Sequence, residues 1–247
     1  SFQIPEYTSD VNALGTLRLL EIIRHYKKKK IKFYQASSSE MFGKSKPPQN
    51  EKTLFQPRSV YAISKVFAYH SVIHYRDAYA LHACNGILFN HESPRRGVNF
   101  VTKKIVQGLV RIKQGKQKML ILGNLYSRRD WGHANDYVES MWKILQQKKA
   151  NDFVIATKTS NSVKDFINIC AKKLNIKLNW KNKGLKEIAI NKLTNKTIIK
   201  VDQKYFRETE VDNLVGDFSK ARRLLKWKPK YSFDKLIDDM INHELNV

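Results

Sequence analysis

Residues 31–40 have the sequence IKFYQASSSE, a short apolar run that ends in three hydroxyls and one carboxylate. A brief run rich in isoleucine and aromatic residues is typical of a buried strand, which we expect over Ile31–Ala36. The polar cluster Ser37–Glu40 follows directly, at the carboxyl end of that strand. The position of this cluster makes it the first candidate for a functional site.

Helices and a second strand surround this stretch in a regular order. Apolar residues recur at helical spacing over Asp10–Arg24 and again over Ser59–Tyr79, and Leu81–Phe89 predicts a second strand. This alternation predicts an α/β fold with a parallel sheet. Ligand sites of such sheets lie beyond the carboxyl ends of the strands, where both Ser37–Glu40 and Asn90–Arg96 fall.

The second half of the chain has a different pattern, in which short helices and strands are mixed. It includes a stretch rich in lysine and asparagine from Lys172 to Lys200 and an amphipathic helix over Phe233–Leu245. We therefore expect two domains. Residues 1–97 would hold the parallel sheet, and residues 98–247 would form a smaller mixed α/β domain with some segments that return to the first sheet.

The ten glycines never occur with the spacing G-x-G-x-x-G or G-x-x-G-x-x-G. Glycines in those spacings let the backbone cradle the phosphates of a dinucleotide at a helix N-terminus. The sequence also begins without methionine, on a residue typical of the middle of a domain. We therefore expect a fragment that lacks the glycine-rich N-terminal part of a nucleotide-binding sheet.

The chain is strongly basic, because 46 lysines and arginines exceed 22 acidic residues and give a net charge of +24. The run Lys27–Lys30 could form a patch for nucleic acid or an anionic surface. The other interpretation is a solvated loop on a lysine-rich surface. We favour the loop and expect no nucleic-acid partner, because no aromatic platform or nucleic-acid motif accompanies the run.

Several classes of protein are excluded or disfavoured by composition. No apolar run approaches the roughly 20 residues of a membrane helix, and the N-terminus has no signal-peptide pattern. Cys84 and Cys170 are too few for a disulfide framework or a thiolate metal site. No cluster of histidine, cysteine and aspartate has metal-ligand spacing. We expect a cytoplasmic protein with no metal and no membrane partner.

Four residues could carry chemistry. Tyr61 and Lys65 are four residues apart on a predicted helix and therefore share one face. A nearby ammonium lowers the pKa of a tyrosine, which would make Tyr61 a general base. Ser38 could bond a substrate oxygen from the end of its strand, and Glu40 projects from the same place. Each residue alone is commonly structural; together they are candidate catalytic residues.

Ser38 and Glu40 lie within one of five longer strings that accompany the Tyr61–Lys65 pair: PEYTSDVNALGTLRLLE (5–21), KFYQASSSEMFGK (32–44), LFNHESPRRG (88–97), LGNLYSRRDWGHANDYVESMW (122–142) and YFRETEVDNLVGD (205–217). Together they closely resemble the GDP-mannose 4,6-dehydratase family of extended short-chain dehydrogenases/reductases. The resemblance extends from Pro5 to about Leu245.

The resemblance implies a Rossmann-type parallel sheet, N-terminally truncated, with a smaller mixed α/β substrate domain. It implies a lyase that converts GDP-mannose to GDP-4-keto-6-deoxymannose and water with recycled NADP, on the route to GDP-fucose and other deoxyhexoses. In the family's scheme Tyr61 takes the proton of the C4 hydroxyl as hydride leaves C4. Lys65 lowers the Tyr61 pKa and bonds the nicotinamide ribose. Glu40 removes the C5 proton before water leaves from C6.

Position by position, the resemblance also implies binding residues. NADP contacts fall on Tyr7, Lys65, His91 and Arg96. GDP-sugar contacts fall on Asn90, Val101, Lys104, Leu120, Arg129, Arg207 and Glu210. The cations among them suit a diphosphate. The family commonly forms dimers or tetramers, so a homo-oligomer is expected.

Two features leave room for other hypotheses. Ser38 stands where the family has threonine; a serine keeps the hydroxyl without the methyl that restricts its rotamer, so we expect retained but slower chemistry. The absent glycine loop allows a catalytically silent remnant, and the 247 residues alone are expected to be inactive. The charge of +24 allows a basic polyanion-binding protein on the same fold.

Overall fold

The computed structural model describes residues 1–26, 31–206, 209, 211 and 213–246. Its first sheet has three parallel strands in the order β1 (Lys32–Ser38), β2 (His82–Leu88) and β7 (Phe153–Ile155). The register places Ser38 opposite Leu88, so β1 and β2 end at the same edge of the sheet. The α/β fold with a parallel sheet is confirmed, and β7 comes from the second half of the chain.

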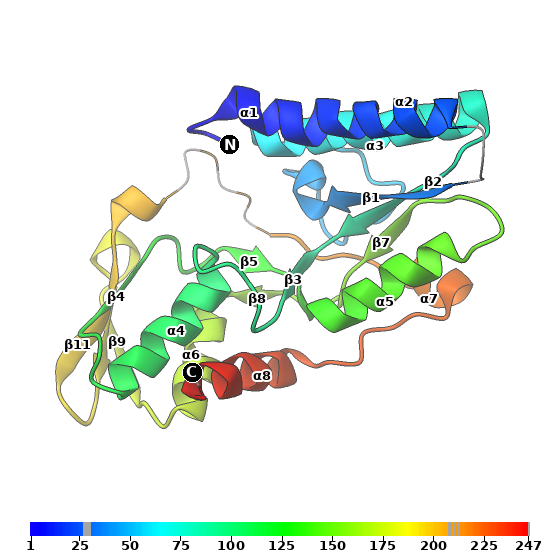
Figure 1. Ribbon diagram of the computed structural model, residues 1–247. Helices are drawn as coiled ribbons and strands as arrows, with labels where there is room; N and C mark the ends of the chain where they lie inside the picture. The colour runs from blue at the N-terminus through cyan, green and yellow to red at the C-terminus, as the bar shows by residue number, and fades with distance from the viewer. Residues whose placement is uncertain (27–30, 207–208, 210, 212, 247) are drawn as a thin grey trace.

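Helices cover both faces of this sheet (Figure 1). On one face, an almost unbroken helical run lies beside the long helix α3 (Val60–Tyr79). The run consists of α1 (Pro5–Ser9), a π-helical turn (Asp10–Leu14) and α2 (Gly15–His25). The other face is covered by α5 (Ala134–Leu145) and α7 (Ser219–Leu225).

Apolar periodicity explains why these layers pack together. Leu20 of α2 is fully buried against Val72 of α3 and Ala83 of β2. Every residue of β2 from Ala83 to Leu88 is buried, as expected for the central strand of a sheet covered on both faces. Burial of such apolar surface stabilises the fold by roughly 25 cal/mol per Å².

The second part of the molecule packs three helices against a mixed sheet (Figure 1). The helices are α4 (Val101–Lys113), α6 (Val163–Lys173) and α8 (Phe233–Leu245). The sheet has the order β4-β11-β10-β9, with bounds Leu120–Leu122, Lys196–Val201, Ile188–Asn191 and Leu178–Lys181. The expected helix over Phe233–Leu245 is confirmed, and the lysine-rich stretch forms most of this sheet.

Two short pairs of strands lie between the two parts. β3 (Asn90–Glu92) continues the chain after β2 and pairs in parallel with β6 (Trp131–His133). β5 (Arg128–Arg129) pairs antiparallel with β8 (Asn161–Ser162). These strands place residues of the second part next to the edge where β1 and β2 end.

Three sequence expectations concern the molecule as a whole. The Lys27–Lys30 run lies outside the described residues. Cys84 and Cys170 are both buried and unpaired with each other. Across the described residues, no helix is both long enough and apolar enough to cross a membrane.

Candidate active site

The end of β1 delivers Ser38 and Glu40. Ser38 closes the strand because its Oγ accepts a hydrogen bond from the Glu40 N–H at 3.2 Å, which starts a 3-10 turn over Ser39–Phe42. The turn ends at Gly43, whose φ of +51° and close approach to the Gln56 carbonyl leave no room for a Cβ. The local sequence therefore turns the chain sharply and leaves Glu40 at the strand end.

The first two turns of α3 deliver Tyr61 and Lys65. The Ser59 hydroxyl caps this helix by accepting from the Ala62 N–H at 3.1 Å. Lys65 Nζ donates to the Ala36 carbonyl oxygen at 3.0 Å and lies 5.6 Å from the centre of the Tyr61 ring. The spacing of four residues thus puts both groups over the end of β1, as the sequence predicts.

The electrostatics of Tyr61 differ from the sequence expectation. Burial raises the pKa of the Tyr61 phenol, and the Glu40 carboxylate raises it further. A hydrogen bond with Ser38 and the charge of Arg96 act in the opposite direction. The Lys65 ammonium donates to the backbone of β1, and the cation whose charge lowers the Tyr61 pKa in this structure is Arg96; that Lys65 also lowers this pKa stays a prediction.

Arg129 of β5 brings the second part of the molecule to Glu40. Its Nε lies 4.0 Å from Glu40 Oε1. Its Nη1 donates to the carbonyl oxygens of Val211 and Arg128, at 2.6 and 2.9 Å. These bonds hold a buried guanidinium against the carboxylate that follows β1.

His91 and Arg96 follow β2 at the same edge. His91 Nδ1 lies 2.9 Å from the Phe89 carbonyl oxygen, and its ring stacks on Tyr137 at 4.8 Å between centroids. Burial lowers the pKa of His91, so the ring is held neutral near pH 7. The charge of Arg96 lowers the pKa of both His91 and Tyr61.

Other residues implied by the resemblance are less directly joined to this cluster. Tyr7 projects from α1 with 67% of its surface exposed. Lys104 Nζ lies 3.9 Å from the centre of the Tyr205 ring. The side chain of Leu120 is buried in the core of the second part, so a ligand could meet only its backbone.

The remaining implied residues divide into two groups. Asn90 begins β3, and Val101 begins α4 with its side chain packed partly against the core. Arg207 and Glu210 lie outside the described residues.

Within the described part of the chain, no group of three or more histidine, cysteine, aspartate or glutamate side chains could hold a metal ion.

Sequence reasoning missed Glu92. This carboxylate is almost fully buried, yet its Oε2 lies 3.0 Å from Arg96 Nε and accepts from the Thr102 hydroxyl at 2.6 Å. The signal was present, because glutamate and arginine stand four residues apart in NHESPRR. It was weak because that spacing predicts a pair only on a helix, and this segment is a strand followed by a turn.

Comparison with known proteins places this geometry in a family. The family model described as GDP-mannose 4,6 dehydratase matches residues 1–240. GDP-mannose 4,6 dehydratase 1 of Arabidopsis thaliana is 52% identical over all of this chain, which spans 64% of that protein's length. GDP-mannose 4,6 dehydratase of Dictyostelium discoideum is 50% identical over 99% of this chain, which spans 69% of that protein.

Solved structures agree at the level of the fold. RMD from Pseudomonas aeruginosa, complexed with NADPH, superposes with a TM-score of 0.84 over 99% of this chain and 76% of its own, at 20% identity. dTDP-glucose 4,6-dehydratase from Bacillus anthracis, complexed with NAD, has a TM-score of 0.76 over 95% of this chain and 68% of its own, at 21% identity. From the family match and the two curated relatives, the chain belongs to the GDP-mannose 4,6-dehydratase family.

Proposed function

We propose that the full-length protein is a lyase that converts GDP-mannose to GDP-4-keto-6-deoxymannose and water. The observation that carries the proposal is Glu40 beside the Ser38–Tyr61 pair. Oxidation at C4 needs one base, and the following elimination needs a second base at C5. An epimerase needs only the first. A carboxylate in the short turn after Ser38 that acts electrostatically on Tyr61 therefore favours dehydration.

The donor set fits the nicotinamide end of NADP. Lys65 lies 5.6 Å from the centre of the Tyr61 ring and Arg96 acts electrostatically on its phenol, and two such cations suit ribose hydroxyls and a phosphate. Bound NADP would accept hydride from C4 and return it to C6, so it would be recycled. The 247 residues contain no glycine-rich phosphate loop. A polypeptide of these residues alone is therefore expected to bind NADP weakly and to be inactive.

The contacts of the four candidate catalytic residues support the roles that the family resemblance implies. Tyr61 would take the proton of the C4 hydroxyl, with its phenolate supported by the Ser38 hydrogen bond and the Arg96 charge. Lys65, tied to β1 through the Ala36 carbonyl, would orient the ribose. Glu40 would remove the C5 proton, which the new 4-keto group acidifies, and the C6 hydroxyl would leave as water.

The binding residues named from the resemblance remain part of the proposal. Arg129, 4.0 Å from Glu40, is placed to meet the diphosphate of a GDP-sugar beside the reacting carbons. We assign the NADP side to Tyr7, Lys65, His91 and Arg96. We assign the remaining GDP-sugar contacts to Asn90, Val101, Lys104, Leu120, Arg207 and Glu210.

Mass spectrometry of GDP-mannose incubated with the full-length protein and NADP tests this function. The expected product is lighter by one water, without net accumulation of NADPH. An unchanged mass would support the catalytically silent alternative. NADPH that accumulates in step with turnover would indicate a net oxidation and overturn the lyase. Binding to RNA or duplex that weakens steeply with salt would support the polyanion alternative.

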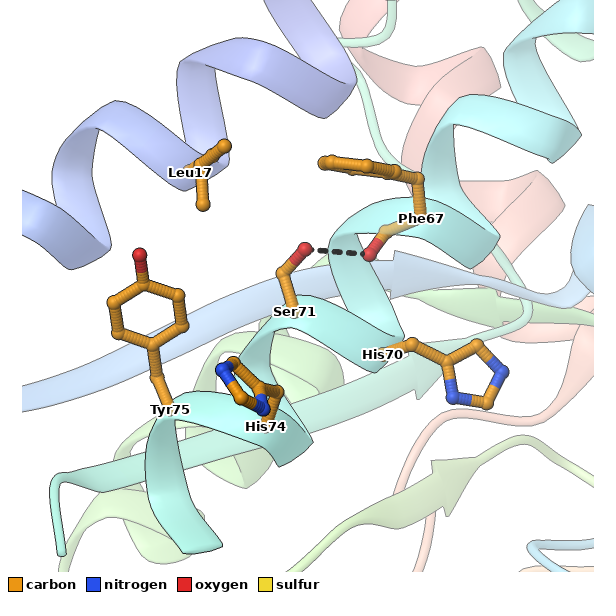
Figure 2. Close-up of a pocket in the computed structure, with 6 residues that line it drawn as sticks. All are labelled: Leu17, Phe67, His70, Ser71, His74 and Tyr75. Atoms are coloured by element: carbon orange, nitrogen blue, oxygen red, sulfur yellow. Dashed lines mark hydrogen bonds between the residues drawn. The ribbon is translucent and has the colours of Figure 1, made fainter. Parts of the chain in front are cut away.

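We further propose a homo-oligomer, a dimer or tetramer, in which α2 and α3 face a second copy. Exposed apolar side chains run along both helices, including Leu19 and Ile22 of α2 and Ile63 and Phe67 of α3. Figure 2 shows the groove between the helices, lined by Leu17, Phe67, His70, Ser71, His74 and Tyr75. A contiguous apolar face of this kind is unfavourable in water and is typical of an interface. A cytoplasmic location stays a prediction.

A further inference from the structure

Arg96, the cation that acts on Tyr61, is itself held by protein groups. Its Nε lies 3.0 Å from Glu92 Oε2. Its guanidinium stacks over the Phe100 ring at 3.4 Å. Among the described residues no acceptor is found for its Nη atoms, and about a quarter of the side chain is exposed. The guanidinium is thus fixed along one edge and open along the other.

Glu92 is fixed in turn by α4. Its side chain is only 2% exposed, and its Oε2 accepts from the Thr102 hydroxyl at 2.6 Å. Burial raises the pKa of Glu92, whereas Arg96 and the Thr102 hydrogen bond lower it. A carboxylate this deeply buried stays ionised only while those partners remain. The pair is therefore mutually dependent.

The turn between Glu92 and α4 is anchored at a second point. Lys103 Nζ donates to the Pro94 carbonyl oxygen at 2.8 Å and forms an ion pair with Glu244 of α8. The Arg96 N–H donates to the Ser93 carbonyl oxygen at 3.0 Å. The backbone that carries Arg96 is consequently attached to the helices of the second part as well as to β3.

We propose that Glu92 is a positioning residue that, with Phe100, fixes the Arg96 guanidinium in the turn after β3, with its Nη edge available to a phosphate of the bound nucleotide. The inference rests on the proposed function for the identity of that ligand. An unrestrained arginine would lose rotamer entropy on binding the phosphate. Glu92, Phe100 and Thr102 remove that cost before the ligand arrives.

The ion pair also explains why a glutamate is tolerated in this nearly dry position. A neutral side chain would remove the negative charge 3.0 Å from Arg96 Nε, and an alanine at 96 would leave the Glu92 carboxylate buried without its ion pair. Both partners must therefore be changed together to separate positioning from a general loss of stability.

The test measures the dissociation constant of NADPH from the full-length protein by calorimetry, with the melting temperature as a second readout. Glu92→Gln is expected to weaken binding on the order of tenfold, and Arg96→Gln at least as much. Because Glu92 acts through Arg96, adding Glu92→Gln to Arg96→Gln should produce no further loss. Glu139→Gln, which removes the charge that pairs with Lys143 and Lys230 away from Arg96, is the matched control.

Thr102 provides a test that does not depend on changing a buried charge. Thr102→Val preserves the shape of the side chain but removes the hydroxyl that holds Glu92, and should weaken NADPH binding about threefold. Thr102→Ser keeps the hydroxyl and should bind as the unaltered protein does. If Glu92→Gln does not fold, the comparison of Thr102→Val with Thr102→Ser tests the positioning role of Glu92.

Three outcomes would overturn the positioning role. The first is unchanged NADPH binding by Glu92→Gln. The second is a loss of affinity on adding Glu92→Gln to Arg96→Gln that equals the loss caused by Glu92→Gln alone. The third is equal NADPH binding by the two Thr102 variants. Failure of the unaltered protein to bind NADPH would instead remove the proposed function, and this inference with it. The two failures are therefore distinguishable in one experiment.

Discussion

Arg129 Nε lies 4.0 Å from Glu40 Oε1, so a guanidinium from the second part of the molecule faces the carboxylate that follows β1. Neither side chain is freely solvated, with 8% and 22% of their surfaces exposed. An anionic sugar nucleotide bound at Arg129 would therefore lie against Glu40. This relationship links substrate binding to the proposed elimination step.

Replacing Glu40 separates the two chemical steps. Glu40→Gln keeps the size of the side chain but removes the base proposed for C5, so dehydration should fall by at least about 10²-fold. Oxidation at C4 uses Tyr61 rather than Glu40 as its base and should persist in part. Product mass and NADPH absorbance in a single turnover report the two steps. An unchanged dehydration rate would exclude Glu40 from the mechanism, and Glu139→Gln serves as the control.

Ser38 supports both Glu40 and Tyr61. Ser38→Ala removes the acceptor for the Glu40 N–H and the hydrogen bond to Tyr61, and should lower kcat by about 10²-fold. Ser38→Thr keeps the hydroxyl and restricts its rotamer, so its kcat should equal or exceed that of the unaltered protein. Steady-state kinetics measure both. A threonine variant as impaired as the alanine variant would contradict this role of the hydroxyl.

The pH dependence of C4 oxidation should follow Tyr61. The groups that face it are Ser38, Glu40, Lys65 and Arg96. Since burial raises the Tyr61 pKa, the phenol is protonated at neutral pH and the oxidation rate should rise as pH increases.

Removing the Glu40 charge near Tyr61 tests the direction of this pH dependence. The Glu40 carboxylate raises the Tyr61 pKa, so Glu40→Gln should move the midpoint of the oxidation profile to lower pH. The measurement is the single-turnover rate of NADPH formation against pH. A midpoint displaced to higher pH would show that another group controls the rate.

Asp130 stabilises the loops around Arg129. Its two carboxylate oxygens accept from the N–H and hydroxyl of Thr157 and from the N–H groups of Lys158 and Gly216, at 2.6 to 3.2 Å. In Asp130→Asn an NH₂ group must face N–H donors, which should cost about 2–4 kcal/mol.

Thermal unfolding measures the effect of Asp130→Asn. For a chain of this size each kcal/mol lowers the Tm by about 2–4 °C. Asp77→Asn is the control, because that side chain is 72% exposed. Equal melting temperatures for the two variants would contradict a structural role for Asp130.

The oligomer prediction is tested on the α2–α3 face. Phe67→Lys places a charge in the groove of Figure 2 and should shift the protein toward monomer by at least about tenfold in the dissociation constant. Sedimentation measures the change. Trp142→Lys, on an exposed position of α5 across the sheet, should have no effect. Dissociation by the control instead would place the interface on α5.

Local features of the sequence determined much of the fold and of the site. The run IKFYQASSSE predicted β1 and its polar end, and helical periodicity predicted α3 and α8. The four-residue spacing of Tyr61 and Lys65 placed both on one face, because helix geometry alone sets that relationship. Long strings predicted the family. Each of these signals is carried by residues close together in the chain.

Only the tertiary structure decided which charges act on one another. Arg129 meets Glu40 because β5 lies between the two parts of the molecule, and Arg96 acts electrostatically on Tyr61 although 35 residues separate them in the sequence. The positioning role of Glu92 could be inferred only from the structure, in which β3 and α4 bury this side chain beside Arg96 and Thr102. Electrostatic interactions depend on distance and burial in space, and residue spacing along the chain specifies neither for segments that meet only after folding.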